Sequence, residues 1–146
     1  MTMPVLIDST VMIDFLKDTK KATIIIKKLV DDKIPICISA ISVYEVFLGI
    51  MANLYLKEGR PSKVPELLGV YKQFLLQLDV LPFTRGAAER AGDLRAQSIG
   101  KGLSIKEKDC QIAGIALFNG INKVITWDEQ DFKKIFDISG LKYESY

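Results

Sequence analysis

Four acidic residues lie where their side chains can converge on one site. They are Asp8, Glu45, Asp109 and Asp128. The first and the last each end a short apolar run typical of a buried strand, and the other two fall in the first turns of predicted helices. Carboxylates gathered in one place repel one another unless a hard cation lies among them. The pattern therefore predicts a metal-dependent enzyme.

The composition excludes most other kinds of catalytic chemistry. The chain has no histidine, which excludes Ser-His-Asp and Cys-His nucleophiles, histidine zinc sites and imidazole acid–base pairs. Cys37 and Cys110 stand apart in apolar surroundings, which predicts buried thiols of a reduced, cytoplasmic protein. Glycine-rich nucleotide-binding loops are absent too. An enzyme with this composition is left with carboxylates and a divalent ion.

Length and charge set the remaining limits. The 146 residues, 49% of them apolar, suit one domain with a real core, which we expect to span residues 1–146. No apolar run approaches the roughly 18–20 residues needed to cross a membrane. Twenty basic and eighteen acidic residues give a net charge of +2, which permits nucleic-acid binding without arguing strongly for it. If metal masks several acids, the rest of the surface is basic.

Apolar runs alternate with amphipathic helices along the chain. We expect strands at residues 4–7, 34–39, 79–82 and 123–126, and an edge strand at 138–143. We expect helices at residues 10–17, 20–32, 42–56, 62–78, 85–99, 105–119 and 129–136. This order predicts an α/β fold with a mostly parallel sheet covered on both faces. Sites in such sheets lie outside the carboxyl ends of strands, near the point where strand order reverses, so the four acids should meet there.

Helix capping offers an alternative explanation for each acid. Ser42 and Glu45 match a capping box, and Ser104 with Glu107 matches another. The acids that follow the two strands can likewise cap the next helices. Glu107 already fills its box, however, which leaves Asp109 without a structural task. Caps also do not require a carboxylate after two different buried strands, so the four acids together favour a metal site.

The same segments, in the same order, resemble those of PIN-domain ribonucleases, especially the VapC-type toxins of prokaryotic toxin–antitoxin pairs. The matching segments are Asp8-Ser9-Thr10, residues 38–46 with Gly49 after them, residues 109–113 and residues 124–132. The match covers essentially the whole chain, and the set of four is specific although each piece is short. Two positions depart from the family pattern. Thr10 stands where Asn or Ser is common, and Lys106 stands where many members have Gly.

The resemblance implies a three-layer α/β/α PIN-like fold with a central, mostly parallel sheet of four to five strands. It implies an endoribonuclease that uses Mg²⁺ or Mn²⁺, with the four acids as ligands directly or through water. It also implies a homodimer and inhibition by a small cognate antitoxin. Two other hypotheses stay open: an RNA-processing PIN nuclease without an antitoxin, and an inactive PIN module that binds RNA or protein. The intact acid set argues against the inactive module.

Polar residues beside the acids are candidates for supporting roles. Ser9, Thr10 and Thr126 can hydrogen-bond a carboxylate or the phosphate, although capping and strand-end bonds explain them equally well. Asp131 is a candidate for the surroundings of the metal site, and it can also cap its helix or pair with Lys134.

Basic residues near Asp109 are candidates for contacts with the RNA backbone. Lys106 and Lys108 flank this acid, and Arg85 lies on the preceding predicted helix. Each of them also has the ordinary explanation of a solvated charge. Arg85 in addition has Glu89 four residues ahead of it, which predicts an ion pair within the helix.

Aromatic residues gather on the two predicted helices between the second and third strands. They are Tyr44, Phe47, Tyr55, Tyr71 and Phe74. We expect core packing to explain most of them and any exposed remainder to form a dimer or antitoxin surface.

Overall fold

The computed structural model describes residues 2–146 and builds them from five strands and seven α-helices. Met1, which the expected domain includes, lies outside the described residues. The strands are β1 (Val5–Ile7), β2 (Ile36–Ser39), β3 (Asp79–Leu81), β4 (Lys123–Thr126) and β5 (Lys142–Ser145). The helices are α1 (Ser9–Leu16), α2 (Lys20–Asp31), α3 (Ala40–Tyr55), α4 (Val64–Leu75), α5 (Arg85–Gly100), α6 (Glu107–Phe118) and α7 (Gln130–Ser139).

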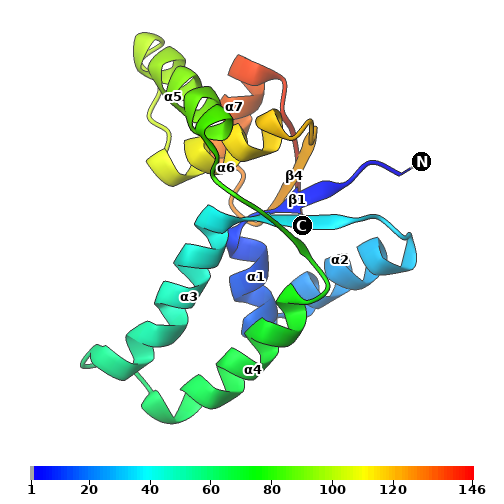
Figure 1. Cartoon of the computed structure of the whole chain (residues 1–146), viewed down its shortest axis with the longest axis vertical. Coiled ribbons are helices and arrows are strands. Elements are labelled where there is room, and N and C mark those ends of the chain that lie inside the picture. Colours follow the sequence, from blue (N-terminus) through cyan, green and yellow to red (C-terminus); the bar gives the residue numbers. More distant parts are fainter. Residues whose placement is uncertain (1) are drawn as a thin grey trace.

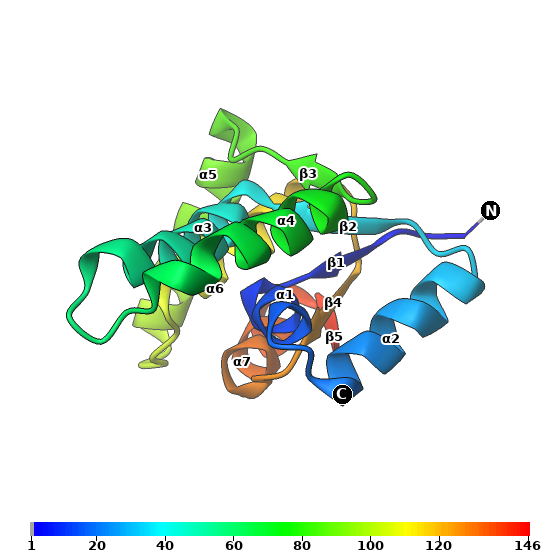
Figure 2. The same ribbon diagram turned by 90° about the horizontal axis from the view of Figure 1, so that it is seen from below.

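The five strands form one sheet in the order β3-β2-β1-β4-β5. Every neighbouring pair is parallel, and Figure 2 shows the strands in this order. From β1 the chain builds outward through β2 and β3, then returns to the other side of β1 for β4 and β5. The strand order therefore reverses between β1 and β4, where the polypeptide leaves a cleft at the carboxyl ends of the strands.

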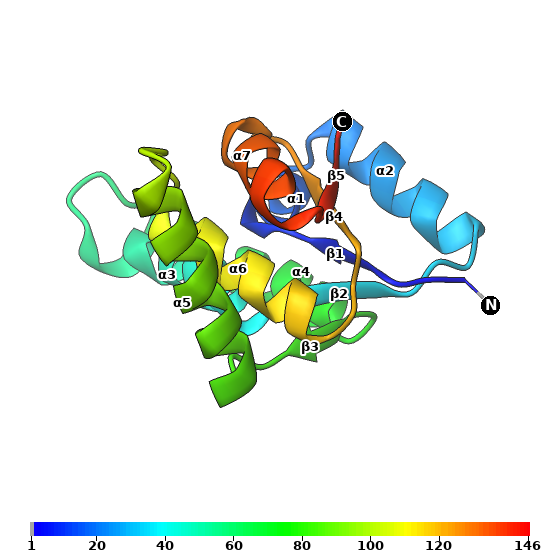
Figure 3. The ribbon, with the colours of Figure 1, turned by 90° about the horizontal axis from the view of Figure 1, so that it is seen from above.

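Helices cover both faces of the sheet, as expected for an α/β/α fold. Neighbouring strand residues point to opposite faces, so Val5 and Ile7 pack with α1 to α4 while Leu6 packs with α5 to α7. Figure 1 shows these two helix groups on either side of the sheet, with the α3–α4 pair extending beyond it. Figure 3 shows α5 lying across α6 on the second face. The expected fold class is confirmed.

A glycine sets the close approach of α5 and α6. A Cβ at Gly114 would lie 2.7 Å from the carbonyl oxygen of Ala87 and 2.7 Å from the Cβ of Ala91. The Ala87 oxygen is a backbone atom of α5 and the Ala91 Cβ is bonded directly to that backbone, so neither atom can move without shifting the helix. The contact fixes α6 between α5 and the sheet, and α6 carries Asp109 in its first turn.

Neither of the two capping boxes offered as alternative explanations forms. Helix α3 begins two residues earlier than expected, so its N-cap is Ser39, whose hydroxyl accepts a 3.0 Å hydrogen bond from the amide of Ser42. Ser42 is therefore already inside the helix, and Glu45 is free of a capping role. Helix α6 begins later than expected, with Lys106 at the N-cap position and no side-chain cap, so Ser104 lies outside it.

Two other element boundaries differ from the expected ones. The expected helix at residues 62–78 is a short 3-10 turn, Pro61–Lys63, followed by α4. Helix α7 extends to Ser139 and ends at Gly140, which has a left-handed φ of 77° that glycine adopts without strain. The edge strand β5 therefore begins at Lys142 and not at Ile138.

The aromatic residues of α3 and α4 are more exposed than expected. Tyr71 and Phe74 are buried, whereas Tyr44, Phe47 and Tyr55 are exposed on α3. Core packing thus explains only the two on α4. Both cysteines are buried free thiols, as expected. No helix within residues 2–146 is long and apolar enough to span a membrane.

Candidate active site

A cavity of about 450 Å³ opens at the reversal point of the sheet. Its lining residues are Asp8, Ser9, Thr10, Glu45, Lys106, Glu107, Lys108, Asp109 and Asp128. The four acids come from four distant segments: the ends of two adjacent strands and the early turns of α3 and α6. The structure therefore brings all four to one cavity. Their role in binding a metal stays a prediction.

Asp8 is the most buried of the four acids and is fixed by the start of α1. It is the N-cap of this helix, and its Oδ1 accepts from the amides of Thr10 and Val11 at 3.0 and 3.4 Å and from the Thr10 hydroxyl. Burial raises the pKa of Asp8 from its ordinary 3.8 to about 6, against the opposing effect of these bonds. The capping hypothesis is therefore right for Asp8. It is compatible with a second role, because all three capping bonds end on one oxygen.

A chain of three serines connects Glu45 to the buried part of the fold. The Ser9 hydroxyl donates to Glu45 Oε1 at 2.7 Å and lies 2.9 Å from the hydroxyl of Ser42. Ser42 in turn lies 3.2 Å from the hydroxyl of Ser39 at the end of β2. All three serines are buried. This chain orients one oxygen of Glu45 and leaves the other, Oε2, directed toward Lys108.

Asp109 has a carboxylate neighbour on another helix. The neighbour is Asp131 of α7, whose Oδ2 accepts from the Lys106 amide at 2.9 Å. Burial first, then the hydrogen bond and charge of Asp131 and the charge of Asp8, raise the pKa of Asp109 to about 8. Asp131 therefore lies beside the site, as expected. The alternative pairing of Asp131 with Lys134 is not observed, because Lys134 donates to the carbonyl of Ser104.

Two lysines neutralise the more exposed acids. Lys106 Nζ lies 3.6 Å from Asp128 Oδ2, and Lys108 Nζ lies 3.8 Å from Glu45 Oε2. All four side chains are at least a quarter exposed, so these ion pairs contribute little to stability and exchange readily for other partners. Asp128 Oδ1 accepts from the amide of Gln130 at 3.3 Å.

The remaining candidates divide between the site and the surface. Thr126 is buried, and its hydroxyl donates to the Asp128 carbonyl at 2.9 Å, which shapes the turn that presents this acid. Arg85 does not line the cavity, and its side chain is 91% exposed beside Glu89 at 3.6 Å, as the spacing predicted. The inward-facing Ser39 and Ser42 were missed as site residues, since a hydroxyl chain between segments leaves no sequence pattern.

The donor set fits a hard divalent ion. Every acidic donor in the cavity is a carboxylate oxygen, and Mg²⁺ needs only one or two such ligands because it keeps several waters. The raised pKa values of Asp8 and Asp109 have burial as their largest cause, with charge repulsion adding to it at Asp109, and a cation would offset both. Within residues 2–146, however, no three acidic or cysteine side chains are already arranged to hold one ion. Binding would therefore need side chains such as Glu45 and Asp128 to turn away from their lysines.

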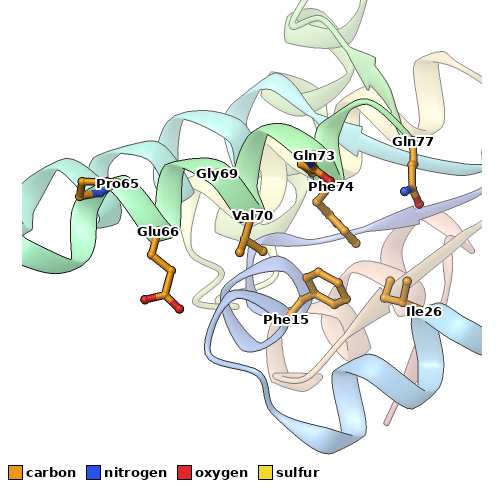
Figure 4. Close-up of a pocket in the computed structure, with 9 residues that line it drawn as sticks. All are labelled: Phe15, Ile26, Pro65, Glu66, Gly69, Val70, Gln73, Phe74 and Gln77. Carbon is orange, nitrogen blue, oxygen red and sulfur yellow. The ribbon is translucent and has the colours of Figure 1, made fainter.

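A larger cavity elsewhere lacks these features. It has a volume of about 540 Å³ and lies between α1, α2 and α4, as Figure 4 shows. Phe15, Ile26, Val70 and Phe74 provide most of its apolar wall, and Glu66 is its one charged lining residue. This groove suits an apolar partner, whereas the acidic cavity suits chemistry.

Comparisons with known proteins agree with this architecture. A model of the PIN domain matches residues 5–136. A Shigella flexneri protein named tRNA(fMet)-specific endonuclease VapC is 28% identical over 111 residues, or 75% of this chain and 74% of that protein. The crystal structure of DNA-bound VapBC from Salmonella typhimurium contains a chain that is 25% identical, with a TM-score of 0.80, over 99% of this chain and 98% of that one. A chain of VapBC2 from Rickettsia felis, bound to a promoter DNA fragment, has a TM-score of 0.81 at 21% identity over 99% of both chains, which shows the fold alone.

The burial of Asp8 makes a prediction about the metal-free protein. The folded protein binds the Asp8 proton more tightly than the unfolded chain does, because the folded-state pKa of about 6 lies above the ordinary 3.8. The stabilisation by this proton is complete below pH 4 and is lost as the pH rises through 6. Asp8→Asn keeps a capping side chain but removes the charge. In chelator, the free energy of unfolding of Asp8→Asn minus that of the wild type should rise by about 3 kcal/mol between pH 4 and pH 8. Denaturant unfolding measures it, and an equal difference at both pH values would contradict this account of the carboxyl.

Proposed function

The chain belongs to the PIN domain family, and we propose that it is an endoribonuclease that hydrolyses RNA phosphodiesters with Mg²⁺ or Mn²⁺. Asp8, Glu45, Asp109 and Asp128 are the proposed ligands, directly or through water. The observation that carries the proposal is the convergence of these acids, from four distant segments, on one cavity at the reversal point of the sheet. The endonuclease name of the Shigella flexneri relative supports the same reaction class.

The protein's own groups have distinct tasks in this mechanism. A divalent ion, when bound, supplies the charge that phosphodiester hydrolysis needs at the phosphate and the leaving oxygen. The α1 cap holds Asp8 in place, and the Ser9 hydroxyl fixes one oxygen of Glu45. Asp131, whose Oδ2 accepts from the Lys106 amide, lies beside Asp109 at the start of α6. Asp8 and Asp109 are thus held in place before any substrate arrives, whereas Glu45 and Asp128 complete the ligand set by turning away from their lysines.

Lys106 and Lys108 have a second task once the substrate enters. Their amino groups lie 3.6 and 3.8 Å from acids that the cation would neutralise. When the ion takes over that neutralisation, the two solvated lysines are free to bind the RNA phosphates at the same cavity. This exchange keeps the local charge balanced in both states. An RNA-processing nuclease without an antitoxin would use the same site, whereas an inactive binding module would have no need of the complete acid set.

Asp8→Asn tests the enzymatic proposal. The variant keeps the α1 cap and loses a charged ligand, so Mg²⁺-dependent cleavage of RNA should fall by at least about 100-fold while the protein stays folded. Asp31→Asn, at an exposed acid at the end of α2, is the matched control and should cleave as the wild type does. Gel analysis of a labelled RNA measures the rates. Cleavage by Asp8→Asn at the wild-type rate would refute the assignment.

We further propose that the function is that of a toxin held inactive by a cognate antitoxin. The solved chains that this one resembles come from toxin–antitoxin complexes such as DNA-bound VapBC. The apolar groove between α1, α2 and α4 is the surface that we assign to such a partner, because its lining is mainly apolar and includes a single charged residue (Figure 4). An apolar segment of an antitoxin would fill the groove and cover Val70, which is 38% exposed.

Val70→Glu tests the partner surface. Val70 lines the groove and is 38% exposed, so a charge there should weaken the complex with the product of a small adjacent gene by roughly tenfold or more without unfolding the chain. Val30→Glu is the control, since Val30 is 52% exposed and lies outside the groove. Co-purification followed by calorimetry measures binding. Equal affinity of the two variants would exclude this groove.

A further inference from the structure

The single tryptophan of the chain is next in sequence to an acid of the cavity and has no task in the mechanism above. Trp127 follows β4 directly and precedes Asp128, which lines the cavity. Its side chain is 49% exposed, although tryptophan is usually well buried. A large ring held half in water at the edge of a proposed nuclease site needs an explanation of its own.

The backbone of Trp127 is fixed to the acid site. Its amide donates to the Thr10 hydroxyl at 2.9 Å, and the same hydroxyl donates to the carboxylate of Asp8. One threonine side chain thus connects the most buried acid to the residue that carries the ring. The position of the Trp127 backbone relative to Asp8 is therefore set by two hydrogen bonds and the end of β4.

A second aromatic ring packs against Trp127. The rings of Trp127 and Tyr146 are 5.3 Å apart between centroids and tilted by 54°. The Tyr146 hydroxyl donates to Asp14 Oδ2 of α1 at 2.8 Å, which fastens the end of the chain to the same helix that begins at the acid site. Trp127 is thus held by the backbone on one side and by a buttressed aromatic on the other, while half of its surface stays open.

The charge around the ring favours a polyanion as its ligand. Lys21 Nζ of α2 lies 5.1 Å from the Trp127 ring centroid, and Lys106 and Lys108 of α6 lie at the acids. Lys21 is exposed, so its contact with the ring is weak and readily exchanged for a stronger partner. One lysine therefore lies at the ring and two lie at the acids, on separate elements. An apolar peptide would gain nothing from them, whereas a nucleic acid strand pairs its phosphates with lysines and its bases with rings.

We propose that Trp127 is a stacking platform for an unpaired base of the RNA, next to the nucleotide whose phosphate lies at the acids, and that Lys21 binds a neighbouring phosphate. This inference rests on the proposed ribonuclease function and adds to it the form of the substrate. Stacking accepts any base but requires one that is not already stacked in a duplex. The platform therefore selects single-stranded RNA without selecting a sequence.

Intrinsic fluorescence tests the platform directly, because Trp127 is the chain's one tryptophan. The full chain carrying Asp8→Asn is titrated in Mg²⁺ with a short single-stranded RNA, with its duplex form, and with an oligomer of equal length and charge whose riboses carry no bases. Stacking predicts that the single strand alone quenches the emission strongly. Equal quenching by the base-free oligomer would overturn the inference, since it would report charge and not stacking.

Substitutions separate stacking from ordinary packing. Trp127→Leu should weaken binding of the single-stranded RNA about tenfold, and Trp127→Phe should restore most of it. Phe136→Leu, at a residue that is 43% exposed on α7, should bind as the parent does. Anisotropy of a labelled RNA measures all three. In the background with intact Asp8, the loss should fall on KM for cleavage and not on kcat.

The outcomes also distinguish this inference from the function on which it rests. If the wild type cleaves RNA and Trp127→Leu binds and cleaves it as the wild type does, the platform is wrong and the nuclease stands. If the wild type never cleaves RNA but the single strand still quenches Trp127, the nuclease is wrong and the platform stands. If Trp127→Leu loses only an antitoxin and not the RNA, the ring is a protein contact and the inference fails.

Discussion

Repulsion among carboxylates at one rim of the sheet is the constraint on which the site depends. The strand order reverses between β1 and β4, so Asp8 and Asp128 leave the sheet side by side, and α6 adds Asp109 next to Asp131. The surrounding groups offset this repulsion. The α1 cap binds Asp8, a serine binds Glu45, the raised pKa of Asp109 favours its neutral form, and two lysines approach the exposed acids. A divalent ion would replace several of these compensations at once, which is the physical basis of the proposed chemistry.

The features that could be predicted from the sequence are those that depend on short-range pattern. Buried apolar runs predicted β1, β2 and β4, and a carboxylate after two of those runs predicted which rim would carry acids. Helix starts were predicted less well. A serine followed three residues later by a glutamate fits a capping box, but Ser39 competes successfully with Ser42 for that position because β2 already ends there. The choice between two nearby N-cap residues depends on the residue at which the preceding strand ends.

The features that could not be predicted are contacts between side chains from distant segments. The chain of hydroxyls from Ser39 through Ser42 and Ser9 to Glu45 joins three elements. The contact between Asp131 and the Lys106 amide joins residues 25 positions apart, and that between Trp127 and Thr10 joins residues 117 apart. Neither has a spacing that a sequence could reveal. These contacts position the acids that the sequence did reveal, so the pattern predicts the donors and the structure explains how they are held.

The proposed function depends on the four acids forming a divalent-cation site. The anomalous difference density of a crystal soaked in Mn²⁺, recorded beside an identical crystal of Asp8→Asn, tests this site. A cation site predicts a strong peak in the cavity of the wild type, within ligand distance of Asp8 and Asp109, with Glu45 and Asp128 turned toward it and away from Lys108 and Lys106. It predicts a lost or much weaker peak in the variant. An empty cavity in the wild type at millimolar Mn²⁺, with the lysines still paired to their acids, would contradict it.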